Sequence, residues 1–133
     1  MSSLYCRANM LKKRFKLCTD SIKVLLFNLF CSNVYCASLW CNFKQASINR
    51  IKVAYNNAFR ILMQLPKNCS ASEMFVTRRV NTVNSLLRNL KYSLMARVVN
   101  SENLYIIAIC TSDIRIRSDL FRSYEVELNT AFI

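Results

Sequence analysis

The fold class of this chain is decided by one stretch, Ser47 to Leu65, which reads SINRIKVAYNNAFRILMQL. Its apolar side chains recur at alternating steps of three and four residues, which is the repeat of one face of an α-helix. They are Ile48, Ile51, Tyr55, Ala58, Leu62 and Leu65. A separate arc of the same helix carries amides and cations, namely Asn49, Arg50, Asn57, Arg60 and Gln64. The stretch predicts an amphipathic helix that stops at Pro66, because proline interrupts the helical hydrogen bonds.

Glycine is absent from all 133 residues, and proline occurs once. Glycine is the usual residue where the backbone takes a positive φ or approaches a phosphate closely. Its absence excludes glycine-rich phosphate loops and the dinucleotide-binding turn, and it removes the commonest tight hairpin turns. Helices joined by short polar links are what remains. We therefore predict a mainly α fold, a small irregular bundle of about five helices with no substantial sheet.

Two further helices are expected after Pro66. Ser70 and Glu73 have the spacing of a capping box, which predicts a short helix through Val76. A longer helix is expected from about Thr82, with one apolar and one polar side. Its inward positions are Val83, Leu87, Leu90 and Leu94, and its polar ones are Asn84, Arg88 and Lys91. The apolar run 104–110 fits a helix or a strand, and residues 114–117 alternate as a strand does, although one strand cannot form a sheet.

Residues 24–43 contain no charged side chain. A run of twenty such residues is long enough to cross a membrane as a helix. Its amide and hydroxyl side chains argue against that interpretation, since four of them fall within one arc of a helical projection. They are Asn28, Ser32, Ser38 and Asn42. We expect a buried amphipathic helix with Thr19 or Asp20 as its N-cap, and no membrane partner.

The first eighteen residues carry five basic side chains and no acidic one, as a transit peptide would. Leu4, Leu11 and Phe15 recur at helical spacing, so we favour an ordinary basic helix over a targeting segment. The whole chain has nineteen Lys and Arg against seven Asp and Glu, a formal charge of +12. Such an imbalance usually implies a polyanionic partner. Nucleic acid is the preferred candidate, with an anionic membrane surface or an acidic protein as alternatives.

The basic helix faces are the candidate nucleic-acid-binding sites. Arg50 and Arg60 on one helix, with Arg88 and Lys91 on another, would straddle a phosphate backbone. Further candidate contacts are Lys12, Lys13, Arg14, Arg78 and Arg79. Binding is expected to tolerate any base sequence, because no recognition-helix or RNA-binding signature is present. Three aromatic side chains, Trp40, Tyr55 and Tyr92, could stack on bases, but we expect them to pack in the core.

No catalytic site is expected in this chain. Histidine is absent, which removes His-based acid–base chemistry and imidazole zinc ligands, and the seven carboxylates are not clustered as a two-metal site requires. The seven cysteines include no C-x-x-C pair, so we expect small buried side chains in a reducing compartment, the cytoplasm or nucleus. We predict no metal site, no cofactor and no small-molecule ligand.

Several segments, in order, resemble one protein family. They are RANMLKKRF (7–15), CTDSIKVLLF (18–27), CSNVY (31–35), LW (39–40), VAYNNAFRILMQLP (53–66), SASEMFV (70–76) and LLR (86–88). The series is similar to the C-terminal part of jockey-type non-LTR retrotransposon (LINE) reverse transcriptases, downstream of the polymerase core. The likeness extends from about Arg7 to Cys110, and the segment that ends at Pro66 is its strongest part.

The resemblance implies descent from an RNA-directed DNA polymerase. Residues 1–112 would be the helical region next to the thumb, and residues 113–133 a tail of uncertain structure. The family's catalytic aspartates belong to a palm that this chain lacks, so the resemblance implies a non-catalytic fragment, from a truncated element or a partial gene model. It would contribute backbone binding to an RNA or DNA template–primer. The alternative is a structural module that docks on the polymerase core and has no activity of its own.

Overall fold

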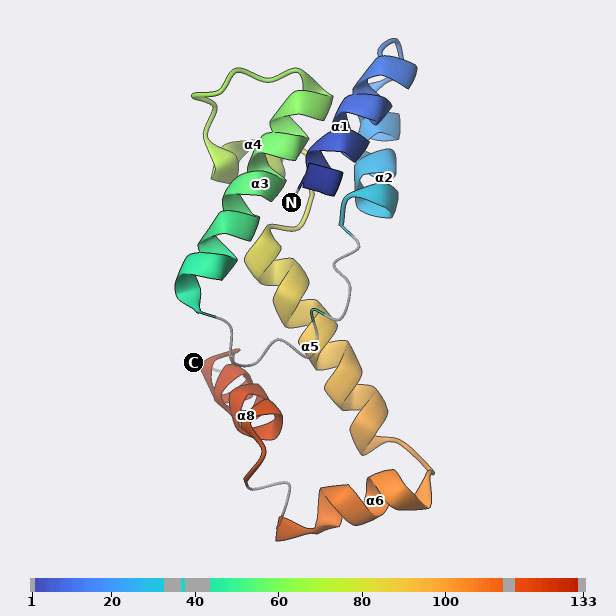
Figure 1. Cartoon of the computed structure of the whole chain (residues 1–133), viewed down its shortest axis with the longest axis vertical. Coiled ribbons are helices and arrows are strands. Elements are labelled where there is room, and N and C mark those ends of the chain that lie inside the picture. Colours follow the sequence, from blue (N-terminus) through green and yellow to red (C-terminus); the bar gives the residue numbers. More distant parts are fainter. Residues whose placement is uncertain (1, 33–36, 38–43, 114–116, 132–133) are drawn as a thin grey trace. The chain divides into compact units, whose positions relative to one another are not determined.

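The computed structural model describes residues 2–32, 37, 44–113 and 117–131. The chain divides into two compact units, which we call the first unit (residues 1–35 and 44–86) and the second unit (residues 36–43 and 87–133). The described residues form seven helices and no strand, which confirms a mainly α fold (Figure 1). The helices are α1 (Ser2–Arg14), α2 (Asp20–Phe30), α3 (Gln45–Met63), α4 (Ala71–Thr77), α5 (Val83–Val99), α6 (Leu104–Thr111) and α8 (Asp119–Ala131). The boundary that the resemblance implies after residue 112 differs from this division and stays a prediction.

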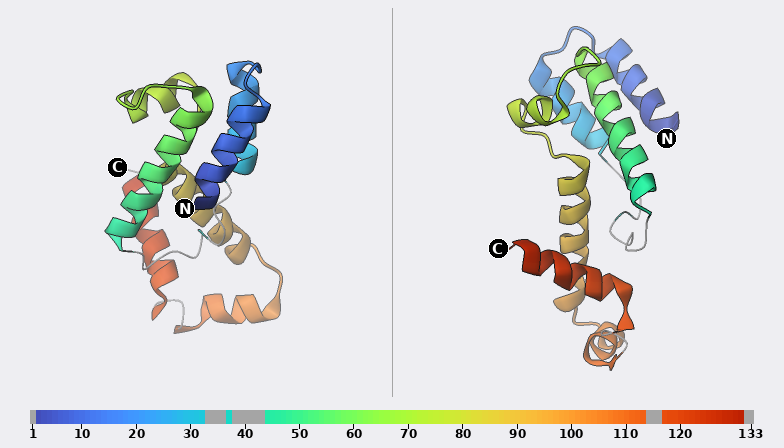
Figure 2. Two further views of the ribbon diagram at one scale, coloured as in Figure 1. Left: turned by 45° about the horizontal axis from the view of Figure 1, so that its top comes forward. Right: turned by 90° about the vertical axis from the view of Figure 1, so that its left-hand side faces the viewer.

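The first unit is built around α3, which packs beside α1 and α2 (Figures 1 and 2). The five residues between α1 and α2 return the chain on itself, so these two helices are antiparallel, while α1 and α3 run in the same direction. The guanidinium of Arg7 donates to the carbonyl of Phe30 at 3.1 Å and so binds α1 to the last turn of α2. A helix end leaves such carbonyls without intrahelical donors, and a cation there is favourable.

Four aromatic rings form the centre of the first unit. Phe27 of α2 lies edge-on to Tyr55 and Phe59 of α3, with ring centroids 4.9 Å apart in both pairs. Phe75 of α4 completes the cluster, 5.0 Å from Phe59 and 5.7 Å from Tyr55. The Tyr55 hydroxyl lies 3.1 Å from Ser32 Oγ and donates to the carbonyl of Asn81 at 3.2 Å, so its polar end is satisfied. Rings at these distances contribute about 0.5–1.5 kcal/mol per pair beyond their buried area.

The predicted stripe of α3 is only part of its buried face. Tyr55, Ala58 and Leu62 are buried as expected, but so are Phe59 and Ala54, which the three- and four-residue steps leave out. The buried face is wider because α3 touches helices on more than one side. The Ser70 cap of α4 is confirmed, since its side chain accepts from the Glu73 backbone N–H at 3.5 Å.

Two corners of the first unit take a left-handed backbone without glycine. Gln64 ends α3 at φ 56° and ψ 37°, and the backbone N–H of Leu65 then bonds the carbonyl of Arg60 at 2.9 Å. Arg79, just after α4, has φ 53°. Side chains with a Cβ are strained in this region, which is why glycine is usual there. A chain without glycine accepts that strain at both ends of the segment that carries α4.

The expected buried helix over residues 24–43 is wrong. α2 ends at Phe30: the backbone N–H of Cys31 still makes the helical bond to the carbonyl of Phe27, but that of Ser32 bonds the same carbonyl, five residues back, and so leaves the helical pattern. Ser38 and Asn42 lie outside the described residues. α2 buries Phe27 and Lys23, while its apolar side chains Ile22, Leu25, Leu29 and Phe30 are exposed. No helix of the described residues is long and apolar enough to cross a membrane.

The second unit has few buried side chains. Its buried residues among those described are Ala37, Met95 and Phe121. On α5 the predicted inward positions Leu87, Leu90 and Leu94 are only half-buried, and Met95 is the residue with no exposed surface. The run 104–110 is helical and forms most of α6, which buries none of its residues. The strand-like residues 114–116 lie outside the part of the chain that the structure describes.

Candidate nucleic-acid interface

The positive charge of the chain belongs almost wholly to the first unit. Its residues include thirteen Lys and Arg and two Asp and Glu, a formal charge of +11. The second unit has six and five, a formal charge of +1. A surface that attracts a polyanion is therefore to be sought in the first unit, since its field extends about a Debye length of 8–10 Å at ordinary salt.

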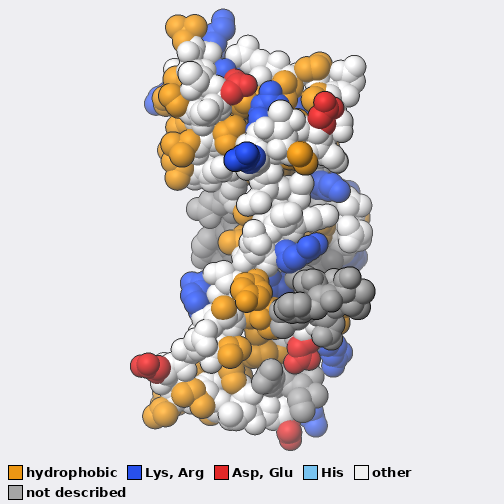
Figure 3. Space-filling view, turned by 180° about the vertical axis from the view of Figure 1, so that it is seen from behind, with side chains coloured by type: hydrophobic (Ala, Val, Ile, Leu, Met, Phe, Trp, Pro, Cys, Tyr) orange, Lys and Arg blue, Asp and Glu red, His pale blue; other side chains and the backbone are white. Residues whose placement is uncertain are grey.

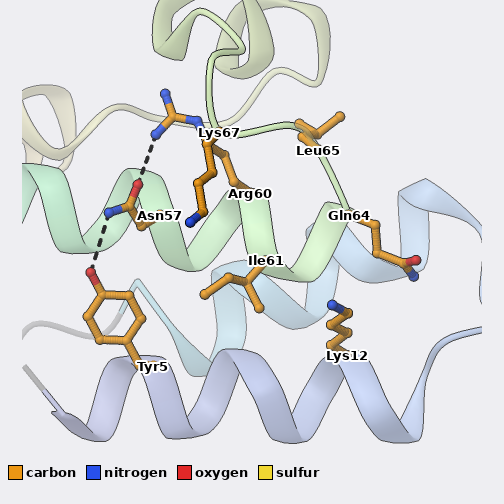
Figure 4. A pocket seen from close by; sticks show the side chains of 8 residues that line it. All are labelled: Tyr5, Lys12, Asn57, Arg60, Ile61, Gln64, Leu65 and Lys67. Carbon is orange, nitrogen blue, oxygen red and sulfur yellow. Dashed lines mark hydrogen bonds between the residues drawn. The ribbon is translucent and has the colours of Figure 1, made fainter.

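A groove lies between α1 and α3 where the two helices run side by side (Figure 4). Its cavity has a volume of about 590 Å³. Three of its side chains are cations, and none is acidic: it is lined by Tyr5, Lys12, Asn57, Arg60, Ile61, Gln64, Leu65 and Lys67. A second cavity shares Tyr5 with this one, and we call the two together the α1–α3 groove. Cations and amides without a carboxylate are the side chains that bind phosphate oxygens.

Arg60 is held in place by the protein on two sides. One terminal nitrogen donates to Asn57 Oδ1 at 3.0 Å, and the other donates to the carbonyl of Cys69 at 2.8 Å. Asn57 in turn donates through Nδ2 to the Tyr5 hydroxyl at 3.5 Å, which joins α3 to α1 (Figure 4). Arg60 Nε is buried without a hydrogen-bond partner. Its positive charge thus meets carbonyl and amide dipoles but no carboxylate.

The groove continues along α3 beyond Tyr5. A second cavity of about 450 Å³ is lined by Tyr5, Asn49, Arg50, Val53 and Ala54. Tyr5 therefore lines both cavities, with Arg50 on one side of it and Arg60 on the other. The polar arc predicted for α3 is found along this line, and four cations line the two cavities: Lys12, Arg50, Arg60 and Lys67.

The two acids of the first unit are remote from this groove. Asp20 pairs with Arg78 at 3.7 Å and with Lys23 at 3.9 Å, at the start of α2. Glu73 lies in the first turn of α4, where a negative charge is favourable. Neither lines the groove. An anion entering between α1 and α3 would meet no carboxylate there.

The structure distributes the predicted basic residues unequally. Lys12, Arg50 and Arg60 line the α1–α3 groove, while Lys13 and Arg14 are exposed on α1 outside it. Arg78 is engaged with Asp20, and Arg79 lies beside it in a hollow that Asp20 also lines. Arg88 and Lys91 belong to the second unit and are described with it: Arg88 is exposed and Lys91 half-buried. The expectation that they straddle a backbone together with Arg50 and Arg60 stays a prediction.

Tyr5 and Lys67 are groove residues that the sequence reasoning did not single out. Tyr5 follows no apolar repeat of α1, and Lys67 stands alone in the link after Pro66. Helical spacing can group residues of one helix, but it does not reveal which helix packs beside it. The feature that unites Lys12, Arg60 and Lys67 is that no acidic side chain lines their cavity. That feature becomes visible only once α1 and α3 are packed together.

The aromatic candidates fall into different settings. Tyr55 is 2% exposed and belongs to the core, as expected. Tyr92 was expected in the core but is 56% exposed, and the centroid of its ring lies 6.1 Å from that of Tyr124. Trp40 lies outside the described residues. Burial raises the pKa of the Tyr55 hydroxyl above its usual value of 10.0, and the hydrogen bond with Ser32 offsets part of that effect.

The described cysteines are free thiols, and only Cys31 is buried. Burial raises the pKa of the Cys31 thiol to about 11, although the nearby charge of Arg7 lowers it. The expectation of buried side chains is wrong for Cys6, which is exposed, because α1 turns that position to solvent. Among the described residues no three Cys, Asp or Glu side chains are grouped so that they could hold a metal ion.

Comparison with protein-family models, with curated proteins and with solved structures gives no match to this chain.

Proposed function

We propose that the chain binds nucleic acid through the phosphate backbone, in a sequence-tolerant way, and that the α1–α3 groove of the first unit supplies the contacts. One observation carries the proposal: four cations line two cavities that share Tyr5, and no acidic side chain lines either of them. Lys and Arg bind phosphates by neutralising their charge and releasing counterions, which requires no base-specific contact. In this proposal the chain has no catalytic activity of its own.

A salt titration tests the proposal. The full chain is titrated against a fluorescently labelled oligonucleotide, and the association constant is measured by anisotropy at several salt concentrations. Four groove cations correspond to about four neutralised phosphates, so the log–log slope is expected near −3.6 for a duplex and near −2.8 for a single strand. Binding that does not change with salt would overturn the proposal.

Adjacent residues on α1 provide the matched control. Lys12 lines the groove and Lys13 does not, so Lys12→Gln and Lys13→Gln remove the same charge at neighbouring positions. The Lys12 variant is expected to lower the slope by about 0.7–0.9, and the Lys13 variant by clearly less. Equal losses would mean that the charge of the whole unit, rather than the groove, attracts the nucleic acid.

Descent from a retrotransposon reverse transcriptase belongs to the same proposal. The basic groove would then be the part of the template–primer contacts that this segment contributes. The reading frame upstream of Met1 tests this descent independently of binding. Polymerase motifs there would support it, and an unrelated sequence would leave only the basic helical module.

A second candidate function is docking on a larger protein, and α6 is the observation that favours it. α6 is an uncharged helix with no buried residue, and Leu104 and Tyr105 are 80% and 83% exposed. Figure 3 shows hydrophobic side chains at the surface over α6 and over α2. Exposed apolar patches often mark protein contacts. Size-exclusion chromatography discriminates: a monomer at high concentration argues against a docking module, and self-association that Leu104→Ser abolishes supports one.

A further inference from the structure

We propose that the α1–α3 groove accepts a single strand of RNA or DNA rather than a duplex, with Tyr5 as the ring on which a base stacks. This inference rests on the proposed function and adds the class of nucleic acid and a stacking residue. It depends on three features of the groove, which are its position between packed helices, its apolar lining, and the place of Tyr5 at its middle.

The position of the groove excludes the body of a duplex. Packed helices have axes about 8–10 Å apart, and the groove lies between two such helices. A double helix is wider than that separation, so it would reach only the rim of the groove. The groove cations include Arg60, which is only partly exposed and is anchored from within by Asn57 and Cys69. A single strand can lie between the helices and reach it.

The apolar side chains that line the groove can contact bases only where the faces of the bases are exposed. Ile61 and Leu65 line the first cavity, and Val53 and Ala54 line the second. The faces of bases in a duplex are covered by their neighbours, whereas a single strand presents them to the protein. Grooves for single strands combine cations that follow the backbone with apolar and aromatic side chains that receive the bases. The two kinds of side chain occur together here.

Tyr5 lies where such a base would be received. It is half-buried, lines both cavities, and its hydroxyl accepts a hydrogen bond from Asn57 at 3.5 Å. That bond, together with the packing of α1 against α3, orients the ring beside the chain of contacts that ends at Arg60. An aromatic ring next to a phosphate-binding cation matches the alternation of base and phosphate along a strand.

The length of the groove sets the number of nucleotides. Arg50 and Arg60 are ten residues apart on one helix, which corresponds to about 15 Å at 1.5 Å per residue. A stacked strand advances about 3.4 Å per nucleotide, so about four or five nucleotides span the two cations. This agrees with the lower end of the range of 4–16 nucleotides that single-strand sites of other folds occupy.

The experiment compares one sixteen-nucleotide thymidine strand with a blunt duplex of equal length, at each salt concentration of the titration, on the full chain. We expect the strand to bind at least about tenfold more tightly. Tyr5→Leu should weaken binding of the strand by roughly five-fold to one hundred-fold, the range of one stacked base, and change duplex binding less than about twofold. Tyr5→Phe keeps the ring and should bind the strand nearly as the unaltered chain does.

A second variant covers the case in which Tyr5→Leu fails to fold. Tyr5→Trp keeps an aromatic ring, and its fluorescence should be quenched by the strand but not by the duplex, with Trp40 fluorescence of the unaltered chain as the baseline. Absence of this added quenching, or duplex binding as tight as strand binding, would overturn the inference. If both nucleic acids bind equally with a steep salt dependence, the proposed function stands and this inference fails. If neither binds in a salt-dependent way, the proposed function fails as well.

Discussion

The two units differ in how they use apolar side chains. The first unit buries a core of large apolar side chains around the rings of Phe27, Tyr55, Phe59 and Phe75, although several on α2 stay exposed. The second unit has an uncharged, mostly apolar helix, α6, none of whose residues is buried. Charge follows the opposite order, with +11 on the well-packed first unit and +1 on the second.

The difference in buried core between the two units indicates which unit can tolerate a high net charge. Self-repulsion destabilises a compact state, and a dense core is needed to offset it. The first unit has that core, so it can tolerate the cations of the α1–α3 groove, which no acidic side chain lines. The second unit has neither a dense core among its described residues nor a charge surplus. The nucleic-acid binding proposed for the α1–α3 groove would therefore belong to the unit with the larger buried core.

The largest expected effect comes from a substitution in the core of the first unit. Phe59 is fully buried and lies about 5 Å from the rings of Phe27 and Phe75. Phe59→Ala is expected to lower the free energy of unfolding by about 3–5 kcal/mol, because it removes a buried ring and leaves a cavity. Tyr92→Ala in the second unit should lower it by no more than about 1 kcal/mol, since that ring is mostly exposed. Urea unfolding followed by circular dichroism measures both, and similar losses would contradict the contrast between the units.

The next effect separates the charge of Arg60 from its hydrogen bonds. Arg60→Lys keeps the charge but loses the planar group that bonds Asn57 and the Cys69 carbonyl together. We expect a loss of about 1.5–3 kcal/mol in unfolding free energy with little change in the salt slope of nucleic-acid binding. Arg97→Lys in the second unit is the control, because its contact with the Ser93 carbonyl is exposed and its loss should be below about 0.5 kcal/mol. A slope that falls with Arg60→Lys would show that geometry, not charge, governs binding.

A third effect concerns pH and the buried thiol of Cys31. Its pKa is about 11 in the folded chain against 9.0 for an ordinary thiol, so the folded state retains the proton longer than the unfolded state. The contribution of this thiol to the free energy of unfolding is fully present below pH 9. It is lost as the pH rises toward 11, by at most about 1.4 kcal/mol per pH unit. Cys31→Ala should flatten the decline between pH 9 and 10. Tyr55, whose pKa is also raised from 10.0, acts in the same direction above pH 10, so a decline between pH 9 and 10 that persists unchanged in the variant would contradict the assignment to Cys31.

The smallest effect is expected where the second unit is most apolar. Ile107→Ser on α6 should change the free energy of unfolding by less than about 0.5 kcal/mol, because the residue is 42% exposed and no residue of α6 is buried. Leu62→Ser in the core of α3 is the matched comparison and should be strongly destabilising. A loss above about 1 kcal/mol for the Ile107 variant would mean that α6 is covered in solution, by a partner or by a second copy.

Sequence periodicity predicted helices better than it predicted their surroundings. α3, the cap of α4 and the start of α5 follow from spacing and capping residues, because these signals are local. The end of α2 at Phe30 did not follow, since an uncharged run has no marker of where burial ceases. Tyr92 and α6 are apolar in sequence but exposed in the structure. Hydropathy cannot distinguish an apolar residue that is exposed from one that is buried.

The candidate site was predictable along one helix only. Arg50 and Arg60 share a polar arc of α3 because helical geometry alone groups them. The other wall of the groove depends on how α1 packs, and α1 contributes Tyr5 and Lys12 through tertiary contacts that no repeat encodes. Lys67 joins them because the left-handed corner at Gln64 turns the link back over α3.

The glycine-free corners at Gln64 and Arg79 have a consequence for local opening. Each holds a side chain in the left-handed region at a cost of order 1 kcal/mol, and both strains vanish when the segment between them opens. Opening α3 would release only the strain at Gln64, which ends that helix. In native-state hydrogen exchange, the amides of α4 should therefore exchange at a lower free energy than those of α3, although Met74 and Phe75 of α4 are as buried as the α3 core. The segment that carries Lys67 and Cys69 against Arg60 would then be the first part of the groove wall to detach.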